Sequence, residues 1–415
     1  MSAVTDAGIA GEVQAGGAEA AIAPPAVRLD PDLLSDIKRF GAADVSACFS
    51  CGTCTAICPL SDDVGTFPRR MIRYAELGMK DALISSKELW TCYHCGACSD
   101  SCPTEADPAG FMAAARRYAI ASYDRTRLAR MLSTRPVIGT IIALAIAAFF
   151  ALFMYASRGP ESASRLALFQ FIPERLIHLT GVVVMSLVAL AGLVGVVTMA
   201  RGIARRERIR FGDVFGGAGA WRRSLGALWA ALGVEALGQR RYRSDCGEAQ
   251  ETEPLYRRRW LLHALTIWGF LGLFLATLLD YGLALAGVKA IGAPVPIWYP
   301  VRLLGTLSGA ALVYGTTLLI RNRLRGANRT ASESRFPDWL LLALLWVTGV
   351  TGFGIELGLY LPHAPAWGYW VFLVHVAVAM ELVLLLPFTK LAHAIYRPVA
   401  LFFHTLAGSR ADAHG

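Results

Sequence analysis

The sequence has little charge and almost no cysteine outside one short region. Only 17% of its 415 residues are charged, whereas 55% are hydrophobic and the mean hydropathy is +0.46. A soluble chain of this length is usually less apolar and divides into two or three domains. The net charge is +9, but no DNA- or RNA-binding motif accompanies it, so no nucleic-acid partner is expected. This composition favours a membrane protein.

Several common signatures are also missing. Residues 1–27 are rich in Ala and Gly and lack a basic segment followed by an apolar one, so we expect a disordered arm rather than a signal peptide. No C-x-x-C-H motif for covalent haem is present. No G-x-G-x-x-G follows a predicted strand, and the Gly-rich stretch 216–221 is expected to be a flexible loop. Substrate chemistry involving a flavin or nicotinamide is therefore expected in partner proteins.

Eight of the nine cysteines form two blocks with the same spacing, C-x2-C-x2-C-x3-C-P. The first block is Cys48, Cys51, Cys54 and Cys58, and the second is Cys92, Cys95, Cys98 and Cys102. A zinc site usually has two ligand pairs separated by a longer spacer. This run is instead typical of ferredoxins with two [4Fe–4S] clusters, in which the fourth cysteine ligates the other cluster.

The crossed pattern assigns the thiolates to two clusters. We expect one [4Fe–4S] cluster on Cys48, Cys51, Cys54 and Cys102, and the other on Cys92, Cys95, Cys98 and Cys58. Gly52 and Gly96 are expected to let the chain wrap tightly around each cluster. His94 is expected to be exposed rather than a ligand. The ninth cysteine, Cys246, is interpreted as a small apolar residue or a free thiol.

Six apolar runs follow residue 136, each long enough to cross a membrane as a helix. They cover residues 137–157, 176–200, 260–284, 300–320, 338–360 and 368–392. The linker between the cysteine blocks lacks the alternation of a strand. We therefore expect an all-α protein: a disordered arm (1–27), a helical dicluster domain (28–133), a six-helix transmembrane cytochrome b bundle (134–398) and a C-terminal tail (399–415).

The arginines predict the orientation of the bundle. They concentrate in the stretches 201–259 and 321–335, whereas Lys289 is the one Lys or Arg in 285–299 and 361–369 together. By the positive-inside rule the basic loops and both termini are cytoplasmic, in the inner membrane. Residues 220–239 of the basic loop form an amphipathic pattern. It predicts a helix at the membrane surface or a docking surface for a partner.

Four histidines fall in or at the apolar runs: His178, His263, His375 and His393. Positions 375 and 393 are five helical turns apart, so on one helix both rings point the same way, about 27 Å apart. Depth then pairs His263 with His393 at an inner haem b, and His178 with His375 at an outer haem b. The alternative is four unrelated histidines that form hydrogen bonds between helices.

Quinone chemistry moves protons, so a quinone site needs protonatable groups beside a haem. The candidates are Asp280, Glu356, His363 and Glu381, which favour the outer face. Each could instead be an interfacial residue exposed to water. Glu381 lies about 9 Å deeper than His375, where it could relay protons or bond to a neighbouring helix.

The stretch from "CFSCGTCTAICP" through "SSKELWTCYHCGACSDSCP" resembles the small iron–sulfur subunit of heterodisulfide reductases. The membrane part resembles the cytochrome b subunit of respiratory nitrate reductase, which also has two histidines 18 residues apart. It departs from that family at Leu273, where a second histidine is usual on the earlier helix. The fusion of both parts resembles the membrane subunit of the quinone-interacting membrane-bound oxidoreductase (Qmo) complexes.

The Qmo resemblance implies a subunit that links menaquinone or ubiquinone to the soluble flavoprotein subunits A and B. Those subunits would exchange electrons with adenylylsulfate reductase in sulfate reduction or sulfur oxidation. One alternative is a tricarballylate-utilisation-type electron acceptor, whose partner is a flavin dehydrogenase of a small acid. Another is a metal-stabilised membrane anchor without redox function.

Overall fold

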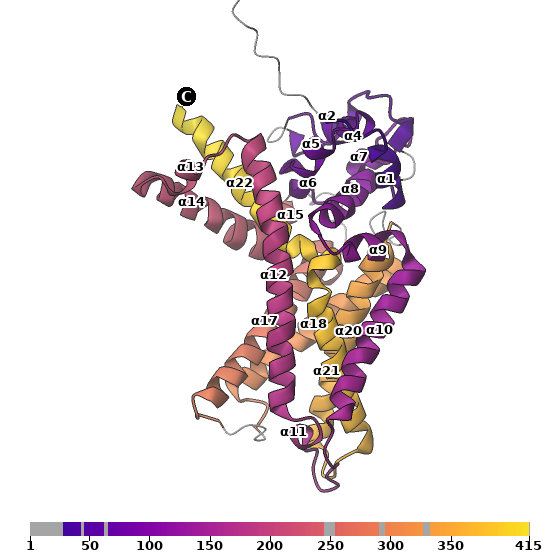
Figure 1. The fold of residues 1–415 in the computed structure, drawn as a ribbon, viewed down its shortest axis with the longest axis vertical. Helices are drawn as coiled ribbons and strands as arrows, with labels where there is room; N and C mark the ends of the chain where they lie inside the picture. The colour runs from indigo at the N-terminus through magenta and orange to yellow at the C-terminus, as the bar shows by residue number, and fades with distance from the viewer. Residues whose placement is uncertain are drawn as a thin grey trace, which may run out of the picture.

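The computed structural model describes residues 28–42, 45–61, 65–244, 254–289, 295–326 and 333–414. The expected arm 1–27 and Cys246 lie outside these residues. The described chain consists of helices and their connections, with no strand, which confirms the all-α expectation (Figure 1). A helical unit that contains the cysteines sits at one end of a bundle of long helices. We call that end of the bundle the cluster side and the opposite end the far side.

The dicluster region is built from short helices around one large one. They are α1 (Leu33–Arg39), η1 (Val45–Ala47), α2 (Thr53–Ala56), α4 (Arg69–Glu76), α5 (Lys80–Ile84), α6 (Glu88–Thr91), α7 (Ala97–Asp100), α8 (Pro108–Tyr123) and α9 (Leu128–Thr134). Asp107 caps α8 by accepting a hydrogen bond from the backbone N–H of Gly110, and Pro108 occupies its first turn. Apolar faces of α1, α4 and α8 meet in a core that includes Ile37, Met71 and Phe111.

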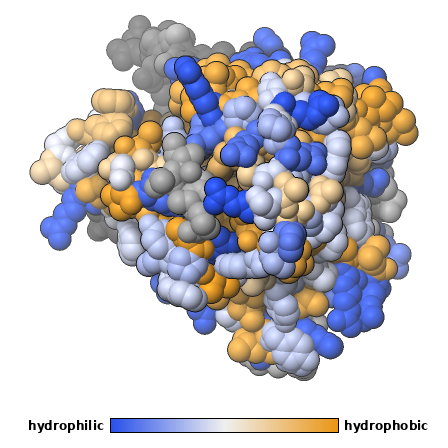
Figure 2. Space-filling view, turned by 90° about the horizontal axis from the view of Figure 1, so that it is seen from below, coloured by the Kyte–Doolittle hydropathy of each residue, from blue (hydrophilic) through white to orange (hydrophobic). Residues whose placement is uncertain are grey.

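Six helices are long and apolar enough to cross a membrane. They are α10 (Pro136–Ala156), α12 (Glu174–Arg206), α17 (Arg259–Leu285), α18 (Pro300–Leu324), α20 (Phe336–Tyr360) and α21 (Ala366–Leu384). Short helices α11 (Leu168–Phe171) and η3 (Leu255–Arg257) lie in the connections. Figure 2 views the far side and shows hydrophobic areas on the flanks, interrupted by hydrophilic residues. This surface suits contact with lipid on the flanks of the bundle.

The expected sixth helix, 368–392, is not continuous. Helix α21 ends at Leu384, two short 3-10 turns follow as η4 (Leu386–Phe388) and η5 (Lys390–Ala392), and α22 (His393–His414) begins at the second histidine. Pro387 causes the break, because proline lacks a backbone N–H and disfavours a helical conformation in the residue before it. The inference that His375 and His393 share one face of one helix is therefore wrong. The expected domain boundary at residue 398 also falls inside α22.

The basic loop folds back on the cluster side of the bundle. It contains α13 (Phe211–Phe215), α14 (Ala218–Trp229), the π-helical segment η2 (Ala230–Leu237) and α15 (Arg240–Ser244). The expected amphipathic helix at 220–239 is present, and α14 and η2 pack against α22 (Figure 1). Trp229 on the opposite face of α14 is 71% exposed. One face of this segment is thus internal, and its end enters the site described below.

Candidate functional site

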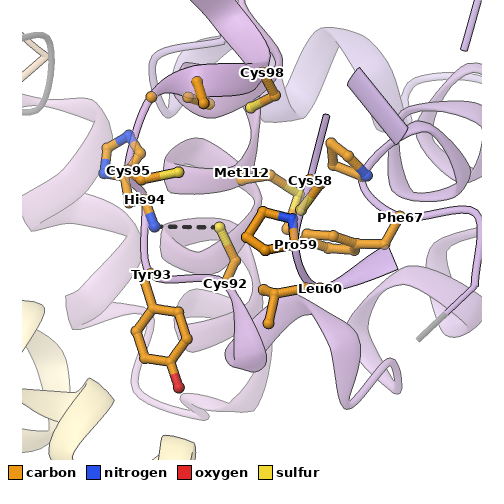
Figure 3. Close-up of a pocket in the computed structure, with 14 residues that line it drawn as sticks. Cys58, Pro59, Leu60, Phe67, Cys92, Tyr93, His94, Cys95, Cys98 and Met112 are labelled. Atoms are coloured by element: carbon orange, nitrogen blue, oxygen red, sulfur yellow. Dashed lines mark hydrogen bonds between the residues drawn. The ribbon is translucent and has the colours of Figure 1, made fainter. Parts of the chain in front are cut away.

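Two cavities in the dicluster region divide the eight cysteines into two sets of four. The larger, with about 490 Å³ of empty space, is lined by Cys58, Cys92, Cys95 and Cys98. In Figure 3 the sulfurs of these four side chains point into the shared space. The smaller, with about 300 Å³, is lined by Cys48, Cys51, Cys54 and Cys102. These two sets are those of the crossed assignment. We call the larger cavity, which contains Cys92, the second cluster cavity, and the smaller one, which contains Cys48, the first cluster cavity.

The backbone turns sharply inside each block at a glycine. Gly52 has φ of 92° and Gly96 has φ of 99°, and each precedes a four-residue helix that carries the next cysteine, α2 or α7. A side chain at either position would be strained, because this left-handed region favours glycine. The two glycines therefore have the wrapping role expected from the sequence.

The buried thiols of the second cluster cavity resist ionisation unless a positively charged centre lies beside them. Burial raises the pKa of Cys58 to about 11, a backbone hydrogen bond from Leu60 opposes this, and Cys92 raises it further. Burial, Cys92 and Cys95 likewise raise the pKa of Cys98. Four such thiolates repel one another unless a metal centre compensates their charge. Among the described residues, no group of three or more His, Cys, Asp or Glu side chains is arranged to hold a single metal ion.

His94 is not exposed as expected. Its side chain is 13% exposed, and its Nε2 lies 2.9 Å from Oε2 of Glu333, which precedes α20. The backbone N–H of His94 donates to the sulfur of Cys92 over 3.3 Å, as the dashed line in Figure 3 shows. Arg259, at the start of α17, donates to the carbonyl oxygen of His94 over 3.4 Å. The loop of the second block is therefore buried against the ends of two membrane helices.

The dicluster region is joined to the bundle by ion pairs and by a buried aromatic cluster. Lys87 lies 2.5 Å from Glu207, which follows α12. The rings of Trp90 and Tyr123 both contact Tyr396 of α22, with centroids 5.6 Å and 5.1 Å away. All three rings are buried. Such an interface holds the second cluster cavity at a fixed position relative to the bundle.

The structure brings His263 of α17 and His393 of α22 together, with ring centroids 6.1 Å apart. Two imidazoles bound to one metal at about 2 Å per metal–nitrogen bond would have ring centres roughly 6 Å apart. The rings therefore have the separation of two axial ligands and are the two that depth in the bundle paired, although the break at Pro387 removes the argument that His375 and His393 share one helix face.

Both rings of this inner pair are oriented by a second hydrogen bond. Nδ1 of His263 lies 3.1 Å from Oε1 of Gln239, and Nδ1 of His393 lies 2.5 Å from the carbonyl oxygen of Lys390. Because both partners are oxygen acceptors, each Nδ1 carries the proton and each Nε2 keeps its lone pair. Burial lowers the pKa of His393 to about 4, against the bond to Lys390, so its imidazole is neutral near pH 7. This is the tautomer and charge state that a metal ligand needs.

Aromatic rings connect the second cluster cavity to the inner pair. Tyr93, beside Cys92, points away from the cavity in Figure 3 and lies 5.9 Å from the ring of Tyr242 in α15. Tyr242 in turn lies 5.4 Å from the ring of His263. The hydroxyl of Tyr93 donates to Glu235 of η2 over 3.1 Å. An unbroken series of side-chain contacts thus leads from the second block to the histidines.

The two outer histidines have separate neighbours. The ring of His178 stacks on Tyr281 of α17 with centroids 3.9 Å apart, and its Nε2 lies 3.2 Å from Glu174. Nδ1 of His375 lies 3.0 Å from Oγ1 of Thr351 in α20. The structure therefore orients His375 but does not bring its ring against that of His178.

The four quinone candidates have different polar neighbours. Oε1 of Glu356 accepts a hydrogen bond from Thr306 of α18 over 3.0 Å and lies 3.5 Å from Nε of Arg302. Asp280 pairs with Lys289, and His363 is exposed. Glu381 is buried, and its Oε1 has no hydrogen-bond partner among the described residues. Glu356 is thus the candidate with an organised polar environment.

Sequence reasoning missed the residues that support the inner pair. Gln239 and Tyr242 come from the basic loop, and no local pattern connects them to a helix of the bundle. The sequence feature that could have located them is the amphipathic stretch 220–239, because its apolar face must pack against another surface. After η2, Gln239 adopts a left-handed conformation with φ of 51° and ends only 4% exposed beneath His263.

Comparison with known proteins agrees with this division of the chain. The family model described as a 4Fe-4S dicluster domain matches residues 44–106, and the model of citrate utilization protein B matches residues 140–414. No solved structure matches the chain significantly.

Curated relatives match single parts of the chain. Citrate utilization protein B of Escherichia coli is 32% identical over 158 residues, which cover 38% of this chain and 39% of that protein. The C subunit of the H(2):CoB-CoM heterodisulfide,ferredoxin reductase of Methanothermobacter thermautotrophicus is 39% identical over 62 residues, or 15% of this chain and 34% of that subunit. The iron-sulfur C subunit of the CoB--CoM heterodisulfide reductase of Methanopyrus kandleri is 34% identical over 70 residues, covering 15% of this chain and 36% of that subunit. The chain thus spans well under half of each of these proteins.

These similarities identify an iron–sulfur electron-transfer subunit whose dicluster region resembles those heterodisulfide reductase subunits. The remaining match runs from the first membrane helix to the C-terminal helix and covers most of the sequence. The chain therefore belongs to the citrate utilization protein B family.

Proposed function

We propose that this chain is the membrane electron-transfer subunit of a quinone-linked redox complex. It would join the quinone pool to soluble flavoprotein subunits through two haems b and two [4Fe–4S] clusters. The observation that carries the proposal is the series of contacts from Cys92 through Tyr93 and Tyr242 to His263, beside His393. These contacts join a thiol-lined cavity to a pair of imidazoles with the spacing of axial ligands.

The residues fit the groups that the proposal requires. The first and second cluster cavities supply four thiols each, and the inner pair supplies two imidazoles whose Nδ1 atoms are engaged. Two imidazoles on one iron make a six-coordinate b-type haem that carries single electrons. The inner haem is proposed on His263 and His393. The outer haem is proposed on His178 and His375, which requires His178 to exchange its contact with Glu174 for iron.

We place quinone on the far side, near Glu356. Oxidation of a quinol releases two electrons and two protons, so a carboxylate that accepts a proton near the ring assists the reaction. Thr306 and Arg302 position the Glu356 carboxylate, and Asp280, His363 and Glu381 are further proton acceptors. Menaquinone and ubiquinone both fit this chemistry. The basic loops 201–259 and 321–335 favour both termini on the cytoplasmic face of the inner membrane.

Two kinds of soluble partner are proposed, each supported by a different observation. The likeness of residues 44–106 to iron–sulfur subunits of heterodisulfide reductases favours flavoprotein subunits of the Qmo type, A and B, which exchange electrons with adenylylsulfate reductase. The family match over residues 140–414 favours the second candidate, a flavin dehydrogenase that oxidises a small acid such as tricarballylate. Both place the flavin chemistry in another chain.

The haem proposal is tested by a spectrum of the purified protein. Reduced-minus-oxidised absorbance should show α-bands of haem b, and their absence would refute both haems while leaving the iron–sulfur clusters untouched. His263→Ala and His393→Ala should each remove the same low-spin haem, while His363→Ala, an exposed residue, should keep it. Loss of different haems in the two variants would refute the assignment of His263 and His393 to one haem.

The partner is tested by purification of the tagged chain from its native membranes, followed by haem reduction assays. Co-purification of two heterodisulfide-reductase-like flavoproteins, with haem reduction by sulfite and AMP through adenylylsulfate reductase, supports the Qmo-type candidate. Haem reduction by a small tricarboxylic acid through a single co-purified flavin dehydrogenase supports the second.

A further inference from the structure

Two arginines lie next to the inner pair, one from each part of the molecule. Arg397 is one helical turn beyond His393 in α22, which places both side chains on one face of the helix about 6 Å apart along the axis. Helix α22 runs from the bundle into the cluster-side layer, so Arg397 lies on the cluster side of His393 (Figure 1). Arg116 comes from α8 of the dicluster region, and its side chain hydrogen-bonds Cys92.

Both guanidinium groups have buried N–H donors without an acceptor. Nε and Nη2 of Arg116 and Nη2 of Arg397 have no hydrogen-bond partner among the described residues. The guanidinium carbon of Arg397 lies 4.2 Å from the centre of the Tyr93 ring, which offers only a π-face. Arginine keeps its charge when buried, so a buried guanidinium with free donors strongly favours a nearby anion.

Neighbouring cations of the same layer have carboxylate partners. Nζ of Lys390 lies 2.9 Å from Asp338, and Nη2 of Arg117 lies 3.5 Å from the same carboxylate. Neither Arg116 nor Arg397 forms an ion pair within the described part of the chain. Arg397 lies over the ring of Tyr93, and Arg116 contacts Cys92, the residue that precedes Tyr93. Two positive groups with unpartnered donors therefore lie beside the same two residues of the second block.

Other buried polar atoms without partners lie around the same place. Nε2 of Gln239, whose Oε1 faces His263, has no partner, and neither has Oε1 of Glu333, whose Oε2 faces His94. Buried polar atoms in folded proteins are nearly always satisfied. The unpartnered N–H donors of Arg116, Arg397 and Gln239 indicate that an anionic acceptor completes the site between the inner pair and the second cluster cavity, whereas the Glu333 oxygen needs a donor.

We propose that Arg116 and Arg397 bind the propionate carboxylates of the porphyrin held by His263 and His393. The planar guanidinium fork matches a carboxylate, and Arg397 lies on the cluster side of its histidine. Arg116 then contacts Cys92 and a propionate with one side chain, which makes it the direct link between the second cluster and the inner haem. This inference rests on the proposed inner haem and adds the residues that fix its orientation.

The test compares two porphyrins on the purified complex. After extraction of haem, iron protoporphyrin IX and its dimethyl ester are titrated back and followed by Soret absorbance. The parent protein should bind the ester at least tenfold more weakly, because the ester has no carboxylates. Arg397→Gln should lose most of this preference, and Arg116→Lys should reduce it, since lysine keeps the charge without the fork. Arg39→Gln, at a side chain 67% exposed, is the control that removes one positive charge.

A second measurement uses the complex with its haem in place. Loss of a positive charge beside the haem favours the ferric form, so the ferrous-to-ferric ratio at fixed potential should fall about tenfold in Arg397→Gln. This corresponds to about 59 mV in midpoint potential. This measurement decides the question if the extracted variants do not rebind haem.

The outcomes separate this inference from the proposed function. Suppose that His263→Ala and His393→Ala lose the haem, but both arginine variants still distinguish the two porphyrins and keep the haem potential of the parent. That result would overturn the propionate site alone. If the histidine variants keep a low-spin haem, the haem placement fails and the arginine site fails with it.

Discussion

Gln239→Leu isolates the hydrogen bond that orients His263. Leucine has nearly the same volume and the same Cβ as glutamine, so the left-handed backbone at this position is equally strained in both. The substitution removes the acceptor 3.1 Å from Nδ1 of His263 and leaves a buried donor without a partner. An unsatisfied buried donor costs about 1–3 kcal/mol. With 1.4 kcal/mol per factor of ten, a central value of about 2 kcal/mol corresponds to roughly 30-fold weaker haem retention.

The assay is the rate at which haem leaves the purified complex for a haem-scavenging apoprotein, together with the low-spin EPR spectrum. Gln239→Leu should release the inner haem roughly 30-fold faster, within the range known for removal of a hydrogen-bond partner of a metal ligand. It should also shift the g-values, because the ring of His263 is freer to rotate. Gln239→Glu keeps an acceptor and makes the imidazole more basic, so it should retain haem and lower the midpoint potential. Gln170→Leu, at an exposed residue of α11, is the matched control. Parent-like release and g-values in Gln239→Leu would refute the role given to this residue.

Three further predictions address the other parts of the site. Cys58→Ala should remove about half of the iron and the EPR signal of the second cluster while the first remains, and two intact cubane signals would contradict the crossed assignment. Glu356→Gln, Glu381→Gln and Asp280→Asn should slow haem reduction by quinol in membranes, most of all at Glu356, and parent rates in all three would move the quinone site to the cluster side. Trp90→Ala should destabilise the packing of the dicluster region on α22 by about 3–5 kcal/mol, measured by denaturant unfolding followed through cluster absorbance. Trp298→Ala, at an exposed ring, should have little effect, and equal losses in both variants would argue against a specific interface.

The cluster cavities were predictable because their information is local. Spacings of two and three residues, a glycine inside each block and a proline after it determine how the backbone wraps, whatever surrounds it. The structure places the eight thiols in the two expected sets. His94 was misjudged for the opposite reason. Its burial comes from Glu333 and Arg259, which are distant in sequence and approach only when the bundle and the dicluster region pack together.

The rings of His263 and His393 lie together as depth predicted, although the accompanying argument about one continuous helix was wrong. An 18-residue interval suggested one helix, yet Pro387 lies between His375 and His393, and a proline inside a helical run indicates a helix end. Depth in the bundle was the sound part of the reasoning, because His263 lies near the start of α17 and His393 follows the end of α21. The supporting residues Gln239, Tyr242, Arg116 and Arg397 belong to three separate segments, and no spacing rule connects them.

In the proposed function, the packing gives the second cluster, rather than the first, the contacts that lead to the inner pair. The second cluster cavity faces the bundle, with Tyr93 directed toward Tyr242 and the inner pair. Beside the first cluster cavity, Phe49 is 63% exposed and Ile57 is also exposed, on a surface of the dicluster region that the bundle does not cover. A soluble flavoprotein of the proposed kind, docked at this apolar surface, would reach the first cluster before the second. Trp90 and Tyr123 pack on Tyr396 and hold the second cluster cavity beside the inner pair. The proposed docking surface and the contact with the bundle therefore lie at different cluster cavities.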